Sequence, residues 1–370
     1  MTPVPYLDLG RARDRIADEL AARWRRVLDA TAYVLGPEVA EFEAGFARYL
    51  GAAGCVGAAN GTDALVVALR ALDLAAGDEV VVPAFTFFAT AEAVILAGGA
   101  PVVADIDPAT LNLDPAAAED ADTARTVGVI GVHLYGRPFD ADALGALCRR
   151  RGLWLVEDAA QAHGASWRGR KAGTLGALAA WSFYPTKNLG CYGDGGALSG
   201  PDGALLERAR RIANHGQDRR YHHLEIGTNS RLDSLQAAVL NCKLPRLDAD
   251  NAARRAIARR YRAALEGVGD LSFPLDPPEA ECVYHQIAVR TARRDALRDH
   301  LAAAGVGTSI HYPEPLHRQP ALAGLADAGA ALPASEAAAL ELLCLPAFPE
   351  LEEAEVERSC AAVRGFFGAP

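Results

Sequence analysis

The middle of the chain consists of short apolar runs that alternate with stretches of helical periodicity. The runs are continuous rather than alternating, which is typical of strands covered on both faces in a mostly parallel sheet with helical crossovers. They are CVGAA from Cys55, EVVVPA from Glu79, PVVADI from Pro101, TVGVIGVHLY from Thr126, LWLVED from Leu153, AAWSF from Ala179 and GGALS from Gly195. The pattern predicts an α/β fold.

Helical periodicity dominates both ends of the chain. It predicts helices over 11–28 and 38–50, and a long helix over 235–265. Beyond that helix, we expect strands in YHQIAVR from Tyr284 and VGTSIHY from Val306, and helices in RRDALRDHLAAAG from Arg293 and SEAAALELLCL from Ser335. With about 150 residues per domain as a guide, the 370 residues suggest two domains. We expect a large α/β domain over 1–245 and a smaller α+β domain over 246–370.

Composition narrows the class of protein. An apolar fraction of 51% with 23% charged residues is that of a globular protein, and a net charge of −10 argues against nucleic acid as a general partner. The N-terminus lacks an apolar signal core and no apolar run reaches membrane-spanning length, so we expect no membrane partner. Seven scattered cysteines without a CxxC pair argue against a metal site and a disulfide framework. The simplest location is the cytoplasm.

Any chemistry that needs a primary amine has three candidates, because the chain contains only three lysines. Lys171 lies among arginines and glycines, as in an exposed turn. Lys243 lies near the end of an amphipathic helix, where a solvated or snorkelling side chain is the default. Lys187 follows an aromatic strand among apolar and small residues, and burial there would lower its pKa and favour attack on an aldehyde. A surface lysine in a tight turn is the alternative.

Polar or small residues follow several of the apolar runs, and ligands of open α/β sheets bind at this edge. They are Asn60, Thr86, Asp105, His133, Asp158 and Ser182. Asp158 is suited to pair with a protonated pyridine nitrogen, which keeps such a ring an electron sink. Gln161, three residues later on a starting helix, would reach a phenolic oxygen. The alternative is that Asp158 only caps that helix.

A possible phosphate site precedes these residues in the sequence. In ANGTDALVVALRAL, small residues lead from a strand into Thr62 and Asp63 and then into a helix, so free N–H groups would face an anion, joined by the Ser182 hydroxyl. The segment is neither a GK[ST] loop nor a GxGxxG motif, which disfavours an ATPase or a dinucleotide enzyme. Phe87 or Phe88 could cover a flat ring, with core packing as the alternative.

Taken together, these segments resemble one known family. The ordered blocks are GTDALVVAL, DEVVVPAFTFFAT, VVADIDPATLNLDP, VHLYG, EDAAQAHGA, SFYPTKNLG, GDGGAL, NHGQDRRYHHLEIGTNSRLDSLQAAVL and HYPEPLHRQPA. They are similar to the DegT/DnrJ/EryC1/StrS sugar aminotransferases from about Pro5 to the C-terminal region. The resemblance implies the aspartate-aminotransferase fold (fold type I), with a mostly parallel seven-stranded sheet and pyridoxal 5'-phosphate as cofactor.

The resemblance also assigns roles to individual residues. Lys187 forms the Schiff base with the cofactor, Asp158 pairs with the pyridine nitrogen, and Gln161 bonds the phenolic oxygen. Phe87 stacks on the ring. The phosphate is held by Gly61, Thr62, Asp63 and Ser182, joined by Asn229 of the partner subunit, which implies a homodimer with shared active sites.

The substrate side of the site follows from the same resemblance. Arg231, His311, Tyr312 and His317 are the implied substrate-binding residues, and Arg231 would serve either the donor carboxylate or the sugar nucleotide. Tyr6 and His163 are expected to act in packing or in support of the site.

The implied reaction moves an amino group from glutamate to a keto group of a nucleotide-linked sugar, for the biosynthesis of a surface polysaccharide or natural product. The segment HGQDRRYHH from His215 is most similar to members that aminate 3-keto sugars, such as UDP-linked hexuronates or dTDP-linked 6-deoxyhexoses. A 4-keto sugar or an aminocyclitol ketone is an open alternative. Members that dehydrate carry histidine in place of Lys187, so the lysine favours transfer. The non-enzymatic alternative is a regulatory protein that binds pyridoxal phosphate.

Overall fold

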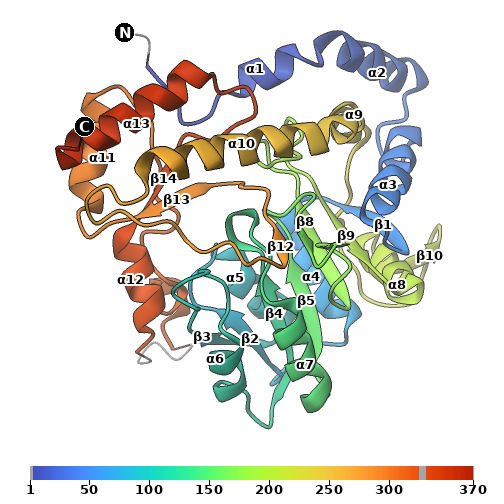
Figure 1. The fold of residues 1–370 in the computed structure, drawn as a ribbon. Helices are drawn as coiled ribbons and strands as arrows, with labels where there is room; N and C mark the ends of the chain where they lie inside the picture. Colours follow the sequence, from blue (N-terminus) through green and yellow to red (C-terminus); the bar gives the residue numbers. More distant parts are fainter. Residues whose placement is uncertain (1–2, 325–330, 370) are drawn as a thin grey trace.

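A central sheet organises the protein, whose computed structural model describes residues 3–324 and 331–369. Its strand order is β1-β9-β8-β5-β4-β2-β3 (Figure 1). The strands are β1 (Gly54–Ala58), β2 (Glu79–Pro83), β3 (Ala100–Ala104), β4 (Thr126–Val132), β5 (Trp154–Asp158), β8 (Leu178–Ser182) and β9 (Gly196–Gly200). Only β9 runs antiparallel to its neighbours, β1 and β8. The prediction of a mostly parallel seven-stranded sheet is confirmed.

Helices cover both faces of this sheet. Val80 and Val82 of β2 share one core with α4 (Gly61–Ala71), α5 (Ala89–Ala97) and α8 (Gly203–Ala213), whereas Val81 shares another with α6 (Pro115–Asp120) and α7 (Ala141–Arg151). Around β1 and β8, that second face packs against α2 (Ala17–Ala30), α3 (Pro37–Leu50) and α9 (Ser234–Lys243). Because successive strand residues face two buried layers, the apolar runs are continuous.

Two predicted helices are each divided in two. The helix expected over 11–28 consists of α1 (Leu9–Asp14) and α2, and that expected over 235–265 consists of α9 and α10 (Leu247–Leu265). Between α9 and α10 lies the 3₁₀ turn Leu244–Arg246, which contains Pro245. Proline lacks the N–H that the helix needs, which accounts for the second break. The domain boundary placed at 245 coincides with this break and stays a prediction.

The C-terminal part has a core of its own, formed mainly by α10, α11 (Arg294–Ala303), α13 (Glu353–Phe367) and the antiparallel pair β13 (Ile287–Arg290) and β14 (Leu342–Leu345). Two predictions were wrong here. The helix expected over 335–345 ends with α12 (Pro333–Glu341), and its last residues form β14. The strand expected over 306–312 makes only isolated bridges, Val306 to Val4 and Ser309 to Cys344. Short apolar runs do not distinguish helix from strand.

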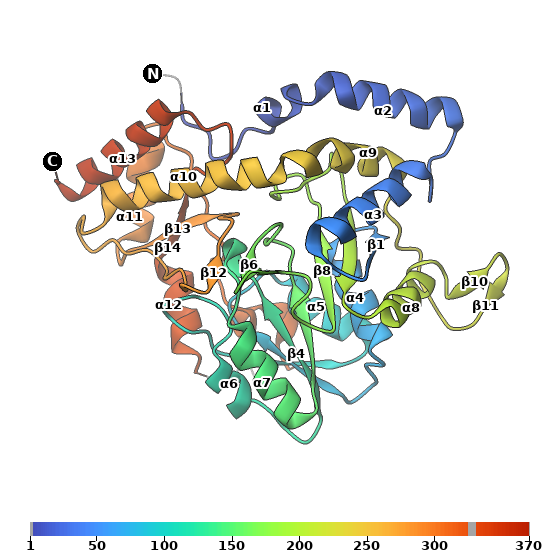
Figure 2. The ribbon, with the colours of Figure 1, turned by 45° about the vertical axis from the view of Figure 1, so that its right-hand side comes forward.

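Smaller elements extend from this framework. The strands β6 (Ser166–Trp167), β7 (Arg170–Lys171) and β12 (Ala280–Glu281) form a small sheet. The hairpin of β10 (Gln217–Arg219) and β11 (His222–His223) projects from the body (Figure 2).

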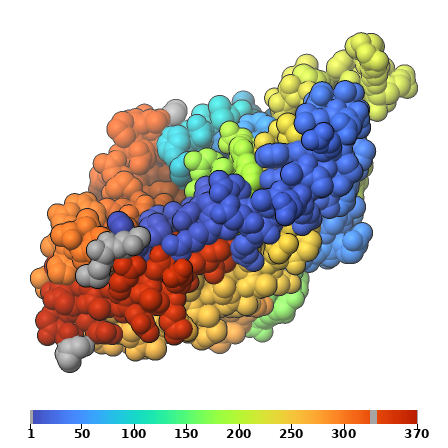
Figure 3. All heavy atoms as spheres, turned by 90° about the horizontal axis from the view of Figure 1, so that it is seen from above, coloured from blue at the N-terminus to red at the C-terminus, as the bar shows by residue number. Residues whose placement is uncertain are grey.

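The N-terminal helices lie alongside the C-terminal helices (Figure 3). Arg11 makes two hydrogen bonds to Glu355 of α13, at 2.7 and 2.8 Å. The N-terminal segment is therefore tied to the C-terminal core. None of the helices in the described ranges is long and apolar enough to cross a membrane.

Candidate active site

Lys187 lies in the loop after β8, at the edge where the parallel strands end. Its backbone N–H donates to the carbonyl oxygen of Tyr184 at 2.9 Å, which closes a tight turn. Burial lowers the pKa of the amine to about 8, and the negative charge of Asp158 partly offsets this decrease. About a tenth of the amine is therefore uncharged at pH 7, far more than for an ordinary lysine, and attack on an aldehyde requires this uncharged form.

Asp158 is the last residue of β5, the strand next to β8, and its side chain is buried. One carboxylate oxygen accepts a hydrogen bond from the Thr90 hydroxyl at 2.8 Å, and the other accepts from the Ala160 N–H at 3.2 Å. Burial raises the pKa of this carboxyl, while these hydrogen bonds and Lys187 act in the opposite direction. A cationic partner would stabilise the buried carboxylate.

The segment after Asp158 corrects one expectation. No helix begins there, because residues 159–165 form successive turns, in which Ala162 N–H bonds Ala159 O and Ala165 N–H bonds Ala162 O. Asp158 therefore does not cap a helix in this structure, and Gln161 is positioned by a turn.

A buried acid–imidazole pair supports the strand ends beside Asp158. His133 Nε2 lies 3.0 Å from Glu157 Oε2, and both side chains are fully buried. His133 Nδ1 accepts from the Phe139 N–H at 3.3 Å, so Nε2 carries the proton and donates to the carboxylate. Glu157 also accepts backbone N–H groups of Gly173, Leu175 and Gly176. The ends of β4 and β5 are thereby fixed next to the site.

Gln161 connects the strand-end loops with the C-terminal part. Its carbonyl oxygen accepts from the Tyr135 N–H at 2.6 Å, and its amide nitrogen donates to the Tyr312 hydroxyl at 3.1 Å. The Phe87 ring, 55% exposed, lies 5.8 Å from the Tyr312 ring between centroids. The Tyr135 hydroxyl donates to the carbonyl oxygen of His311. The structure thus brings together four residues that the sequence placed on the cofactor and substrate sides, with Tyr135 between them.

The N-terminus of α4 faces Ser182. Asn60 caps the helix by accepting from the Asp63 N–H at 2.8 Å. The first N–H groups of a helix have no partner within it, so they can bind an anion. A Cβ at Gly61 would lie 2.7 Å from Ser182 Cβ, so only glycine fits between helix and strand end. These residues form the small cup that the sequence predicts, and its binding of phosphate stays a prediction.

The charge of the lysine acts on three imidazoles, the buried ones of His163 and His285 and the half-buried one of His311. Burial, together with the positive charge of Lys187, lowers the pKa of His163 to about 3 and that of His311 to about 4, and holds the pKa of His285 well below its usual value. His163 is fully buried and packs against the rings of Trp181 and Phe183. All three imidazoles are therefore uncharged near neutral pH.

The remaining predicted residues have partners outside the group described so far. Asn229 is exposed and forms an isolated bridge with Asn214, whose side-chain oxygen accepts from Arg231 at 3.0 Å. His317 is buried, and its Nε2 lies 3.0 Å from Glu336 of α12. The partner of His317 in the structure is thus the carboxylate of Glu336, which is not one of the predicted site residues. The substrate roles of Arg231 and His317 stay predictions.

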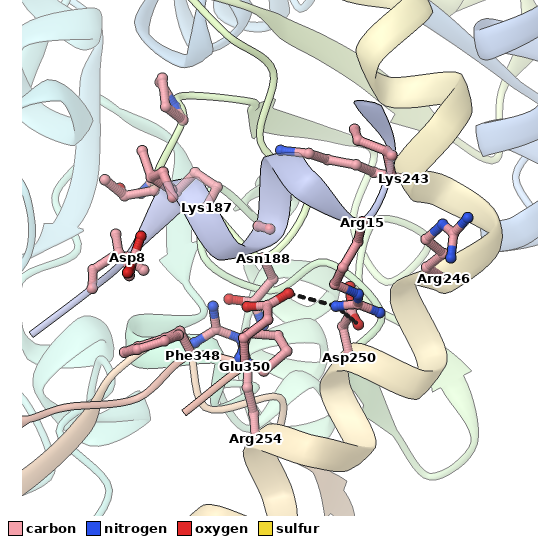
Figure 4. A pocket seen from close by; sticks show the side chains of 17 residues that line it. Asp8, Arg15, Lys187, Asn188, Lys243, Arg246, Asp250, Arg254, Phe348 and Glu350 are labelled. Carbon is pink, nitrogen blue, oxygen red and sulfur yellow. Dashed lines mark hydrogen bonds and ion pairs between the residues drawn. The ribbon is translucent and has the colours of Figure 1, made fainter. Parts of the chain in front are cut away.

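A pocket also lies against the Lys187 loop, between α1 and α10 (Figure 4). Asn188, Lys243 and Arg254 are among its lining residues. Arg15 of the linker after α1 crosses it, 2.9 Å from Asp250 and 2.5 Å from Glu350. The N-terminal segment therefore helps to enclose the lysine loop.

Sequence reasoning missed several residues that support the site. Thr90 bonds Asp158 from the first turn of α5, and Tyr135 contacts both Gln161 and His311. The signal for Thr90 was its place in the first turn of a helix that follows closely after the end of a strand. Tyr135 offered no signal, because it reads as the apolar end of a strand.

Comparison with known proteins extends these observations. Residues 14–364 match the DegT/DnrJ/EryC1/StrS aminotransferase family. A dTDP-3-amino-3,4,6-trideoxy-alpha-D-glucose transaminase of Streptomyces venezuelae is 47% identical over 361 residues, 98% of this chain and 95% of the relative. A UDP-2-acetamido-2-deoxy-3-oxo-D-glucuronate aminotransferase of Pseudomonas aeruginosa is 46% identical over 360 residues, 97% and 99% of the two chains. The crystal structure of S. venezuelae DesV in complex with a ketimine intermediate matches with a TM-score of 0.98 and 46% identity over 100% of both chains.

Proposed function

Because the chain belongs to the DegT/DnrJ/EryC1/StrS aminotransferase family, we propose that it is a pyridoxal-phosphate-dependent transaminase that aminates a nucleotide-linked keto sugar. The observation that carries the proposal is the pairing, at two adjacent strand ends, of Lys187, with its pKa of about 8, and the buried carboxylate of Asp158. The two relatives described above, named for 3-amino and 3-oxo sugars, favour a 3-keto substrate.

The residues around the lysine fit the cofactor. Lys187 would hold it covalently, and Asp158 would face its pyridine nitrogen. The amide nitrogen of Gln161, which donates to the Tyr312 hydroxyl, is a donor suited to a phenolic oxygen. The exposed ring of Phe87 offers a face for stacking.

The residues predicted to bind the phosphate group also fit the cofactor. The start of α4 can approach Ser182 this closely because residue 61 lacks a Cβ. Gly61 and Thr62 supply the first N–H groups of the helix, the N–H of Asp63 already donates to Asn60 Oδ1, and the Ser182 hydroxyl lies beside Gly61. Such a helix N-terminus is a ready anion site.

Bound pyridoxal phosphate supplies an electron sink for the bond changes at the donor carbon. Residues of the protein supply the proton transfer and the charges around the reaction. The Lys187 amine, when free, moves a proton between the donor's α-carbon and the aldehyde carbon, and its lowered pKa keeps it able to accept that proton. Asp158 holds the positive charge of the ring nitrogen in place. His163, His285 and His311 add no further charge near neutral pH.

Gly61→Ala should weaken cofactor binding. The added methyl group would press on Ser182, and overpacking of this kind costs about 1–3 kcal/mol, equivalent to an increase in Kd of about fivefold to 150-fold. The measurement is titration of cofactor-free protein with pyridoxal phosphate, followed by absorbance. Gly203→Ala is the matched control, because Gly203 also begins a helix but a Cβ there would meet open space. Equal affinities of the two variants would argue against a phosphate at this cup.

We further propose glutamate as amino donor and a homodimer in which Asn229 of the partner subunit completes the phosphate site. Asn229 is exposed on the protomer and therefore free to serve a second copy. Arg231, two residues later, has Asn214 as its hydrogen-bond partner and is a candidate for an anionic group of either substrate. A cytoplasmic location fits such a biosynthetic role.

The experiment that tests the function is a substrate screen. Purified protein is incubated with glutamate and dTDP-, UDP- and GDP-linked 3-keto and 4-keto sugars, and the products are read by mass. We expect amination of a 3-keto sugar. Amination of 4-keto sugars alone would mean that the substrate is a 4-keto rather than a 3-keto sugar. Failure with every sugar and with a cyclitol ketone would favour a regulatory role. A yellow colour lost on treatment with borohydride would support the cofactor independently.

A further inference from the structure

Asn251 of α10 lies between the two loops that carry proposed cofactor ligands, and it is only 2% exposed. Its amide nitrogen donates to the carbonyl oxygen of His163 at 2.8 Å, in the turn that also contains Gln161. Its amide oxygen accepts from the amide nitrogen of Asn188 at 2.9 Å, in the loop of Lys187. One buried side chain therefore connects both loops to the same turn of a helix.

The directions of these two hydrogen bonds are fixed by the atoms that face Asn251. A backbone carbonyl can only accept, so the Asn251 atom that faces His163 is the amide nitrogen, and the atom that faces Asn188 is the amide oxygen. The Asn188 nitrogen also faces the carbonyl oxygen of Val283 at 3.0 Å, so it must be a donor. A flipped Asn251 amide would bring two oxygens together at one end and two nitrogens at the other.

The turn at His163 leaves just enough room for the Asn251 side chain. Gly164 has a φ of 91°, in the left-handed region that favours glycine. A Cβ at this position would lie 2.7 Å from Asn251 Nδ2 and 2.5 Å from the Tyr49 hydroxyl oxygen. A side chain there would displace the Asn251 amide from the His163 carbonyl. The hydrogen bond therefore depends on glycine at position 164.

Helix α10 is itself fixed to the C-terminal part of the protein. Arg254 lies three residues after Asn251, on the same face of the helix. Its guanidinium donates to the carbonyl oxygens of Ala347 at 2.7 Å and of Tyr284 at 3.3 Å. Further along the helix, Tyr261 is fully buried in the C-terminal core. Asn251 therefore joins two loops of the central sheet to a support that both of them share.

We infer that Asn251 is a positioning residue that holds the Lys187 loop and the Gln161 turn at a fixed separation. The inference rests on the proposed function, in which Lys187 binds the aldehyde carbon of pyridoxal phosphate and Gln161 binds its phenolic oxygen. These two groups are attached to neighbouring ring atoms, so the spacing of the two loops decides whether both contacts form together. A misplacement of about 1 Å can lower an enzyme's rate by about 10²-fold.

The chain offers a direct probe of the lysine loop, because it contains only three lysines. Lysine labelled with ¹³C at Cε gives three signals in the full-length protein without cofactor, and the signal lost in Lys187→Ala is that of Lys187. In Asn251→Leu the loop loses its link to α10, so water gains access to the amine. We expect the pKa of Lys187 to rise from about 8 toward the ordinary lysine value of about 10.4.

Asn241→Leu is the matched control for the loss of a buried amide. Asn241 of α9 is also buried, but its amide nitrogen donates to Glu38 of α3, to the carbonyl oxygen at 3.0 Å and to the carboxylate at 2.8 Å. We expect the pKa of Lys187 to stay near 8 in this variant. A rise equal to that in Asn251→Leu would mean that general loosening is the cause, and the inference would fail.

Asn188→Ala breaks the same link from the loop side, and it carries the test if Asn251→Leu does not fold. We expect it to raise the pKa of Lys187 as well. The double variant should show no further rise, because Asn251 acts on the lysine loop through Asn188. An unchanged titration of Lys187 in Asn251→Leu, or in Asn188→Ala if the first variant is unfolded, would overturn the inference. Additive effects in the double variant would also overturn it.

A second readout connects Asn251 to catalysis. In the loaded enzyme, we expect Asn251→Leu to lower kcat by about 10- to 10²-fold relative to Asn241→Leu, with a smaller change in KM for the sugar. If no keto sugar is aminated but the Lys187 titration responds as expected, the proposed function fails and the role of Asn251 in the loop stands. If turnover occurs and the two variants have equal kcat, the positioning role fails alone.

Discussion

Lys187→Ala should abolish transamination, with a loss in kcat of at least about 10³-fold. A positioned acid–base group contributes roughly 10²- to 10⁴-fold, and this variant loses the covalent link to the cofactor as well. Burial lowers the pKa of the amine to about 8, and Asp158 acts on it electrostatically. Multiple-turnover assays with glutamate and a keto sugar measure the loss, and borohydride should no longer fix the cofactor to the protein.

Lys243→Ala is the informative control for this result. Burial also lowers the pKa of Lys243 to about 8, so the side chain is not the solvated one that the sequence suggests. Its amine donates to the Gly190 carbonyl at 2.6 Å and lies 4.5 Å from the Tyr192 ring centroid. A lowered pKa alone therefore does not identify the reactive lysine. We expect this variant to turn over, and turnover by Lys187→Ala would refute the assignment.

Asp158→Asn should lower kcat/KM by about 10²- to 10³-fold, the range found when one preorganised electrostatic group is removed. Asparagine keeps the shape and can still accept from Thr90 or Ala160, but it cannot balance a protonated pyridine nitrogen. The measurement is steady-state kinetics at saturating pyridoxal phosphate. A matched control is Asp105→Asn, another strand-end aspartate, whose carboxylate accepts N–H groups of Ala334 and Ser335.

The stability of Asp158→Asn separates catalysis from folding. Burial raises the pKa of this carboxyl above its unfolded value, so its contribution to stability is largest below the unfolded pKa and declines as the pH rises through the folded pKa. At pH 7 the cofactor-free variant should therefore have a Tm no lower than that of the unaltered protein. A large fall in Tm would mean that the carboxylate is structural, and the kinetic loss would no longer support its proposed role.

Local sequence patterns were sufficient to predict much of this architecture. The continuous apolar runs predicted the strands, because a strand buried on both faces needs apolar residues at successive positions. The helix over 38–50 was found within a residue as α3, since Pro37 opens it and Gly51 closes it in the left-handed region. The association of Lys187 with Asp158 followed from strand ends that share one edge.

Other features depended on contacts between distant residues. Leu342 to Leu345 continue a helical pattern, yet they form a strand because β13 offers them hydrogen-bonding partners. The turn at Gln161 depends on the Tyr135 N–H and the Tyr312 hydroxyl, which come from other segments. His317 reads as a substrate ligand, but in the folded protomer it pairs with Glu336.

The sequence by itself determined the sheet, its covering helices and the places of Asp158 and Lys187 at the strand ends, because each rests on periodicity or on position within one short segment. Only the tertiary structure decided the environment of those residues. The lowered pKa of Lys187 and the carboxylate held by Thr90 both depend on burial and on partners far away in the sequence. Desolvation and hydrogen-bond direction are properties of the assembled site, and no local pattern encodes them.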